Sequence, residues 1–73
     1  MTPKEVKEIR VKLGISQSEL AKACNTHVGT IRKWERDSGQ SPSGISVRLL
    51  YLLLDLKYMR QWQWFKKEYI ERG

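Results

Sequence analysis

Three cations near the centre of the sequence have the chemistry of nucleic-acid contacts. Arg32, Lys33 and Arg36 fall within one short segment. Arginine and lysine donate hydrogen bonds to phosphate oxygens and to the O6 and N7 atoms of guanine. The whole chain is also basic, since its 73 residues include 14 Lys and Arg against 8 Asp and Glu and carry a net charge of +6. A basic surface attracts polyanions of many kinds, so the partner must be inferred from the motifs around these residues.

Residue types for catalysis or metal binding are scarce. His27 is the only histidine and Cys24 the only cysteine. Their spacing suits a metal, but a zinc site needs a second pair of ligands. A single cysteine excludes an intramolecular disulfide and suits a reducing compartment. We therefore expect no enzyme, no cofactor and no metal, and we expect Cys24 to be a small buried apolar residue.

The helices that must position the cations are indicated by caps and by glycine. Pro3 suits the first turn of a helix capped by Thr2, and Gly14 suits the position after its end. The apolar residues of this helix recur at helical spacing: Val6, Ile9 and Leu13. Residues 38–44 (SGQSPSG) have the composition of a loop, and residues 45–72 contain neither glycine nor proline. No alternating strand pattern occurs, so the sequence predicts an all-α fold.

A second and a third helix lie between these segments. Ser16 begins the second helix, because Glu19 stands where a capping box requires it. Asn25 tolerates the left-handed conformation of a tight turn. The third helix covers about residues 28–36. The inner-face residues expected from both helices are Leu20, Ala21, Cys24, Ile31 and Trp34.

Two short helices joined by a tight turn form a helix-turn-helix, whose second helix enters the major groove of DNA. Ala21 is small enough for the second helix to cross the first, and Asn25 permits the turn. The outer face of the second helix then carries Val28, Gly29, Arg32, Lys33 and Arg36. Residues 16–36 therefore predict binding of double-stranded DNA.

The segment SQSELAKACNTHVGTIRKWE resembles the motif of Cro/repressor-type (XRE family) helix-turn-helix proteins. The resemblance covers about residues 6–56 and continues through TIRKWE, SPSG and a leucine-rich helix, as in HigA-like antitoxin regulators and small phage or anti-CRISPR-associated repressors. It implies a four- to five-helix lambda-repressor-like domain, extended here by an aromatic C-terminal helix. The residues at family spacing are Gln17, Leu20, Ala21, Ile31, Trp34, Glu35 and Pro42.

The resemblance also implies residue roles. Arg10 and Glu35 stand where the family places a partly buried ion pair that holds the recognition helix to the first helix. Gln17 stands where the family bonds a DNA phosphate and braces the recognition helix. The full set of expected phosphate contacts is Ser16, Gln17, Thr30, Arg36, Ser41 and Ser43.

The base-reading positions depart from the family pattern. Val28 and Gly29 stand where many relatives carry polar amides, so base reading is expected to fall on Arg32 and Lys33, with His27 at the margin. Val28 suits a thymine methyl group and Gly29 a close approach of the backbone. Arg32 has two open roles, as a base reader or as a phosphate contact. Thr26 is an alternative cap for the third helix, because His27 replaces the small hydroxyl residue that is common there.

The last third of the chain is apolar and aromatic over a wide arc. We treat residues 1–57 as the helix-turn-helix part and residues 58–73 as a C-terminal helix of the same domain. Residues 45–72 allow one helix of about 28 residues, roughly 42 Å long. The favoured alternative is a break near residues 56–58, with a fifth helix folded against the first.

The aromatic segment is expected to form a dimer interface, since interface centres are rich in aromatic residues. The expected interface residues are Leu52, Leu56, Tyr58, Met59, Trp62, Phe65 and Tyr69. Completion of the monomer core is the second interpretation of the same residues. A membrane-surface helix is the third, disfavoured by Glu68 and Glu71.

These observations predict a homodimeric repressor that binds an inverted repeat in its own operon's promoter. An antitoxin-like protein that binds a partner such as a toxin through its apolar C-terminal region is the first alternative. A sequence-indifferent nucleic-acid binder is the second. We expect a cytoplasmic protein encoded by a bacterium or a phage, because the N-terminus shows no signal peptide. We also expect no small-molecule effector and no membrane partner.

Overall fold

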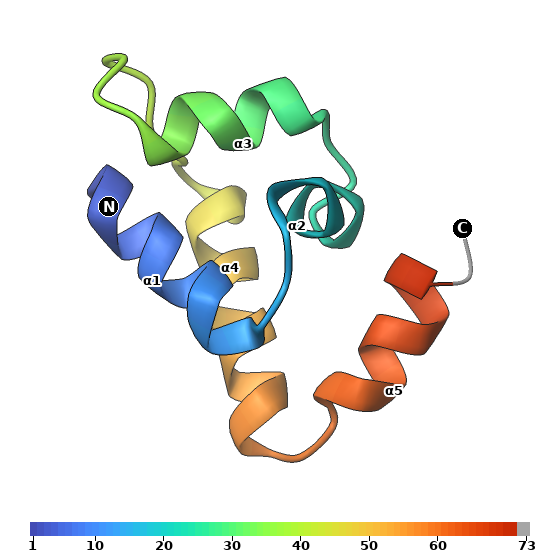
Figure 1. The fold of residues 1–73 in the computed structure, drawn as a ribbon. Helices are drawn as coiled ribbons and strands as arrows, with labels where there is room; N and C mark the ends of the chain where they lie inside the picture. The colour runs from blue at the N-terminus through green and yellow to red at the C-terminus, as the bar shows by residue number, and fades with distance from the viewer. Residues whose placement is uncertain (72–73) are drawn as a thin grey trace.

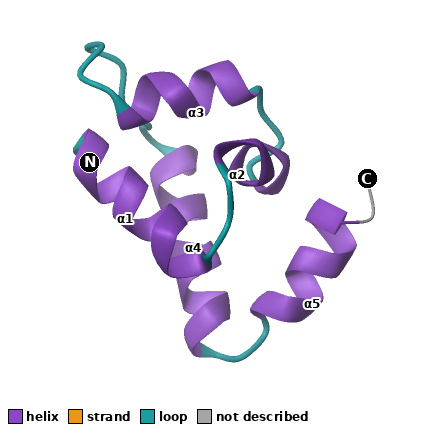
Figure 2. Ribbon diagram, in the orientation of Figure 1, coloured by secondary structure: helices purple, strands orange, loops and turns teal. Residues whose placement is uncertain are grey.

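The computed structural model describes residues 1–71, and within that range every regular element is a helix (Figure 2). This confirms the expected all-α class. The expected continuation of the last helix to Arg72 lies outside the described residues. The helices are α1 (Pro3–Leu13), α2 (Gln17–Ala23), α3 (Val28–Glu35), α4 (Ile45–Tyr58) and α5 (Trp62–Lys66), and α5 is continued by a π-helical turn over Lys67–Glu71.

Reciprocal hydrogen bonds fix the starts of α1 and α2. Glu5 N–H donates to Thr2 Oγ1 at 3.2 Å, and Thr2 N–H donates to Glu5 Oε1 at 3.1 Å. Ser16 and Glu19 form the same pair of bonds at 3.1 and 2.9 Å. The bond from the backbone of each capping residue is the main cause that lowers the pKa of Glu5 and of Glu19. Both predicted N-caps are thus present.

Three helices end in the same way, with a residue in the left-handed conformation. These residues are Gly14 after α1, Asn25 after α2 and Arg60 after α4, with φ of 71°, 53° and 61°. In each case this residue and the next donate their N–H groups to carbonyls three and five residues earlier. This Schellman arrangement satisfies carbonyls that a helix end leaves free. The sequence predicts the ends at Gly14 and Asn25 but carries no such signature at Arg60.

All helices contribute to one apolar core. From α2 the buried side chains are Leu20, Ala21 and Ala23, whereas Cys24 is only half-buried. Cys24 packs against the core without being enclosed by it, so its expected burial is confirmed only in part, and Ala23 is buried in addition. Burial nevertheless raises the pKa of the Cys24 thiol to about 11. The core comprises Val6, Ile9, Leu13, Ile15, Leu20, Ala21, Ala23, Ile31, Trp34, Leu50, Leu53, Trp62 and Ile70.

The chain breaks at residues 59–61, directly after the stretch where the sequence favours a break. The alternative of one long helix is therefore wrong. Beyond the break, the π-helical turn packs against α2, so that the C-terminal segment rises beside α2 rather than along α1 (Figure 1). It is bonded to α1 at the start of α5, where Trp62 Nε1–H donates to Leu13 O at 3.1 Å. No helix among residues 1–71 combines the length and the apolar composition that crossing a membrane requires.

Candidate nucleic-acid interface

An ion pair holds α3 against α1. Arg10 donates to both carboxylate oxygens of Glu35, from Nε at 2.6 Å and from Nη2 at 3.0 Å. The Glu35 side chain is only 5% exposed, and its hydrogen bond raises the pKa of Arg10 further. Arg10 Nη1 also donates to Ile15 O at 3.0 Å. One guanidinium therefore ties the recognition helix and the turn before α2 to the same point of α1.

Gln17 connects α2 to the same ion pair. Its Nε2 donates to Glu35 Oε1 at 3.3 Å, so the structure brings together the three residues expected to support α3. A side-chain amide has two N–H donors, so Gln17 can bond Glu35 with one and still offer the other. Ser16, next to it, is exposed, and its hydroxyl accepts from Glu19 N–H. That hydroxyl retains its own O–H to donate.

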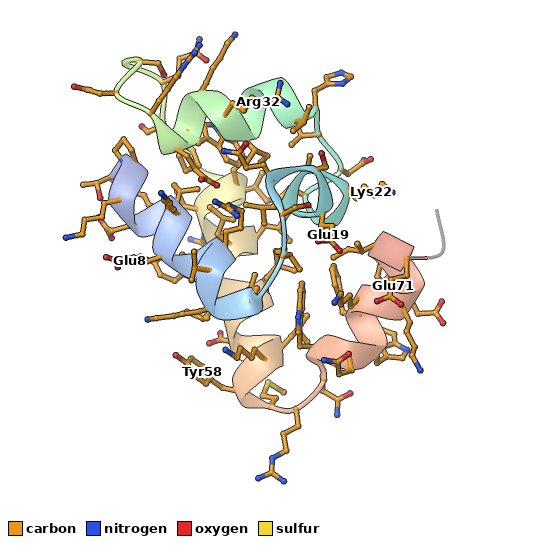
Figure 3. The ribbon with its side chains drawn as sticks, viewed as in Figure 1. Glu8, Glu19, Lys22, Arg32, Tyr58 and Glu71 are labelled. Carbon is orange, nitrogen blue, oxygen red and sulfur yellow. The ribbon has the colours of Figure 1, made fainter. Side chains whose placement is uncertain are left out.

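The outer face of α3 is cationic. Ile31 and Trp34 are buried, whereas Arg32, Lys33 and Arg36 are exposed. The helix thus divides into an inner apolar side and an outer side that carries Arg32 and Lys33, and the exposed Arg36 follows as the residue after its end. Figure 3 shows Arg32 on α3, remote from Tyr58 at the far end of α4 and from Glu71 in the C-terminal segment. The basic face and the aromatic segment are therefore separate surfaces of the molecule.

The first turn of α3 is less polar. His27 is the N-cap and makes no side-chain capping bond, so the alternative cap at Thr26 is wrong. The His27 side chain is exposed, while Val28 packs partly against the core. Gly29 and Thr30 are half-buried. The first turn of α3 therefore carries no lysine or arginine, and the exposed cations begin at Arg32, one turn further along.

The loop after α3 carries the two remaining predicted phosphate contacts. Ser41 and Ser43 are exposed on either side of the buried Pro42. Ser38 Oγ donates to Lys33 O at 2.7 Å and so ties the loop to the end of α3. The loop protrudes beside the start of α1 (Figure 1). The serines therefore extend the polar surface beyond Arg36.

The residues expected at a dimer interface divide into three groups by exposure. Leu52, Tyr58, Met59 and Tyr69 are exposed, and Leu56 and Phe65 are half-buried. Trp62 is only 6% exposed within one protomer. Its burial agrees with the second interpretation, completion of the monomer core, because α5 folds back and places the indole among the core residues. A groove of about 410 Å³ between α4 and α5 is lined by Leu49, Leu52, Leu53, Asp55, Leu56, Met59 and Phe65.

The sequence did not indicate the supporting role of two residues, Ile15 and Trp62. Ile15 is buried and offers its carbonyl to Arg10, and its position as an apolar residue between Gly14 and Ser16 was the available signal. Trp62 reaches the other end of the same turn through Leu13 O. No local pattern could reveal that bond, since 49 residues separate donor and acceptor.

A family model described as Helix-turn-helix (HTH_3) matches residues 6–58 of the chain. Comparison with curated proteins and with solved structures gives no match. The matched residues contain α2, α3 and the Arg10–Glu35 pair, and they end where α4 ends. The chain therefore belongs to the HTH_3 helix-turn-helix family of Cro/repressor-type (XRE) DNA-binding regulators.

Proposed function

We propose that this DNA-binding regulator reads a specific operator as a homodimer and represses its own operon. The observation that carries the proposal is the exposed Arg32 and Lys33, with Arg36 directly after them, on a helix whose orientation is fixed by a nearly buried ion pair. A rigid helix with donors on its outer face suits the major groove.

Base reading is assigned to Arg32 and Lys33. Both are exposed near the middle of α3, within reach of base edges when the start of the helix enters the groove. Val28 and Gly29 add apolar and backbone contacts at that start, with His27 beside them. The proposed phosphate contacts, which fix the register without reading sequence, are Ser16, Gln17, Thr30, Arg36, Ser41 and Ser43.

The groove between α4 and α5 supports dimerisation. Its exposed apolar side chains, among them Leu52 and Met59, lie on a surface separate from α3. One recognition helix reads few base pairs, whereas two related by a dyad read half-sites about 34 Å apart. A second copy of the chain is therefore the proposed occupant of this groove.

Selection from random duplexes, followed by footprinting on the gene's own upstream region, tests the proposed operator. We expect an inverted repeat whose half-sites lie about one helical turn apart. Recovery of unrelated sequences with equal affinity would instead indicate a sequence-indifferent binder. A selected site absent from the upstream region would contradict autorepression and leave specific binding intact.

Light scattering at micromolar concentration tests the dimer. Leu52→Lys places a charge in the groove and is expected to give a monomer. Val11→Lys, at an equally exposed apolar residue of α1, is the matched control and is expected to stay dimeric. A monomeric parent protein would contradict the homodimer, and it would favour the same groove as the site for a different protein partner, as in antitoxin-like regulators.

A further inference from the structure

The turn between α1 and α2 is held by side chains from three helices. Lys57 Nζ of α4 donates to Lys12 O. Trp62 Nε1 of α5 donates to Leu13 O at 3.1 Å, and Arg10 Nη1 of α1 donates to Ile15 O at 3.0 Å. The carbonyls at the end of a helix have no partner within it. Three helices, α1, α4 and α5, thus supply donors to this turn and to the end of α1 that leads into it.

This turn leads directly into the proposed phosphate contacts. Ser16 is the N-cap of α2 and Gln17 its first residue. Arg10 donates to the carbonyl of Ile15, at the end of the turn next to α2, and is itself bonded to Glu35. The end of the turn next to α1 accepts a hydrogen bond at Leu13 O from Trp62. Trp62 lies outside the residues matched by the family model. The C-terminal segment therefore supplies a bond that the family core does not contain.

We propose that Trp62 is a positioning residue for DNA binding, which acts by fixing the turn that presents Ser16 and Gln17 to a phosphate. The inference rests on the proposed phosphate contacts of these two residues. The Trp62–Leu13 hydrogen bond is buried, and a buried carbonyl that loses its donor is costly. Without the indole N–H, the turn relaxes toward solvent and α2 shifts relative to the Arg10–Glu35 pair.

The surroundings of Trp62 keep its ring in place. Phe65 stacks on the indole with ring centroids 5.6 Å apart, and Tyr69 follows with its centroid 4.8 Å from that of Phe65. Ile70, one residue further, is buried in the core. The aromatic row thus anchors the segment on its inner side while Phe65 also lines the groove between α4 and α5. The indole N–H of Trp62 is the group that connects this packing to the turn, through its hydrogen bond to Leu13 O.

Trp62→Phe in the full chain tests the proposal, because it removes the N–H and keeps an aromatic ring. Trp64→Phe is the matched control, since Trp64 is 54% exposed on the same helix. We expect Trp62→Phe to weaken binding to the selected operator and to a random duplex alike, by about tenfold. Its plot of log affinity against log salt concentration should also be shallower, by about 0.9 for one lost phosphate contact. Trp64→Phe should change neither quantity.

Three readouts separate positioning from general stability. Amide exchange at residues 14–17 should quicken in Trp62→Phe while exchange in α3 stays slow. Light scattering should show an unchanged oligomeric state. A lower melting temperature with unchanged affinity and salt slope would overturn the proposal, as would an affinity loss explained by dissociation of the dimer. Binding to the random duplex is measurable whether or not an operator exists. A failure of the role proposed for Trp62 can therefore be told apart from a failure of the proposed operator reading.

A second variant covers the case in which Trp62→Phe fails to fold. Benzothienylalanine at position 62 keeps the bicyclic ring and replaces its N–H by sulfur. The same loss of affinity and slope is expected for this folded variant. Affinity and slope equal to those of the parent protein would overturn the role of the N–H.

Discussion

The helix-turn-helix and the C-terminal segment differ in how their structure is specified. In the first, α1 and α2 begin with capping boxes and end at Gly14 and Asn25, which both suit a left-handed residue. In the second, α5 has no side-chain cap, and the preceding α4 ends at Arg60 with the same left-handed geometry. The same backbone motif can thus be specified by local residues in one region and imposed by packing in another.

The two regions are also held together by different interactions. The helix-turn-helix relies on the Arg10–Glu35 pair, which joins segments 25 residues apart and is shared with Gln17. The C-terminal segment relies on stacked rings and on the buried Trp62 and Ile70. Directional bonds suit a site that must hold donors in register, whereas ring packing suits attachment of a segment to a core.

The largest expected effect tests the role of the ion pair. Glu35→Ala leaves Arg10 without its carboxylate partner and should lower the free energy of unfolding by about 3 kcal/mol. Glu71→Ala is the comparison in the C-terminal segment, because its contact to Lys66 is 3.8 Å long and exposed. That change should cost less than about 1 kcal/mol. Urea unfolding measures both, and equal losses would remove the distinction between the two regions.

The next effect concerns DNA. Arg32→Ala should weaken operator binding by about 1–3 kcal/mol and relax the preference at one base pair, if the guanidinium reads guanine. Gln17→Ala should weaken all duplexes alike, because a phosphate contact carries no sequence information. Fluorescence anisotropy with the operator and with single-base variants measures the difference. A uniform loss for Arg32→Ala would reassign this residue to phosphate.

A smaller effect compares the two helix ends directly. Arg60→Gly removes the backbone strain of an arginine with a positive φ of 61°. This change should raise the free energy of unfolding by about 0.5–1 kcal/mol. Gly14→Ala is the reverse test, with φ of 71° and no atom within 4 Å of the added methyl group. It should lower the free energy of unfolding by about 1 kcal/mol. Changes of the same sign in both variants, measured in urea, would contradict the comparison.

The smallest effect depends on pH. The pKa of Glu19 and of Glu5 is lowered in the folded protein by hydrogen bonds from the capping residues. A carboxyl group with a depressed folded pKa stabilises the protein above its unfolded pKa, which lies near 4.5, and this contribution is lost as the pH falls through the folded value. Glu19→Gln should therefore flatten the decline of stability below pH about 4.5. An unchanged decline in acid urea titrations would contradict this role.

The sequence alone determined the helix-turn-helix and the fold class. Caps, a left-handed asparagine and the spacing of Ile31 and Trp34 are local signals, and local signals act over a few residues whatever the rest of the chain does. The same reasoning placed Arg32 and Lys33 on the outer face of α3. It overestimated the burial of Cys24 and did not predict that of Ala23, since a shift of one residue around a short helix decides which side chain is enclosed.

Only the tertiary structure decided the course of the C-terminal segment. The aromatic residues at helical spacing fit both a straight helix and a folded one, because periodicity does not state which partner covers a stripe. Packing on α2 selected the break at Arg60, turned Trp62 inward and brought its N–H to Leu13. A bond between residues so far apart in sequence forms only once the core exists, because the hydrophobic burial that brings them together belongs to the whole chain.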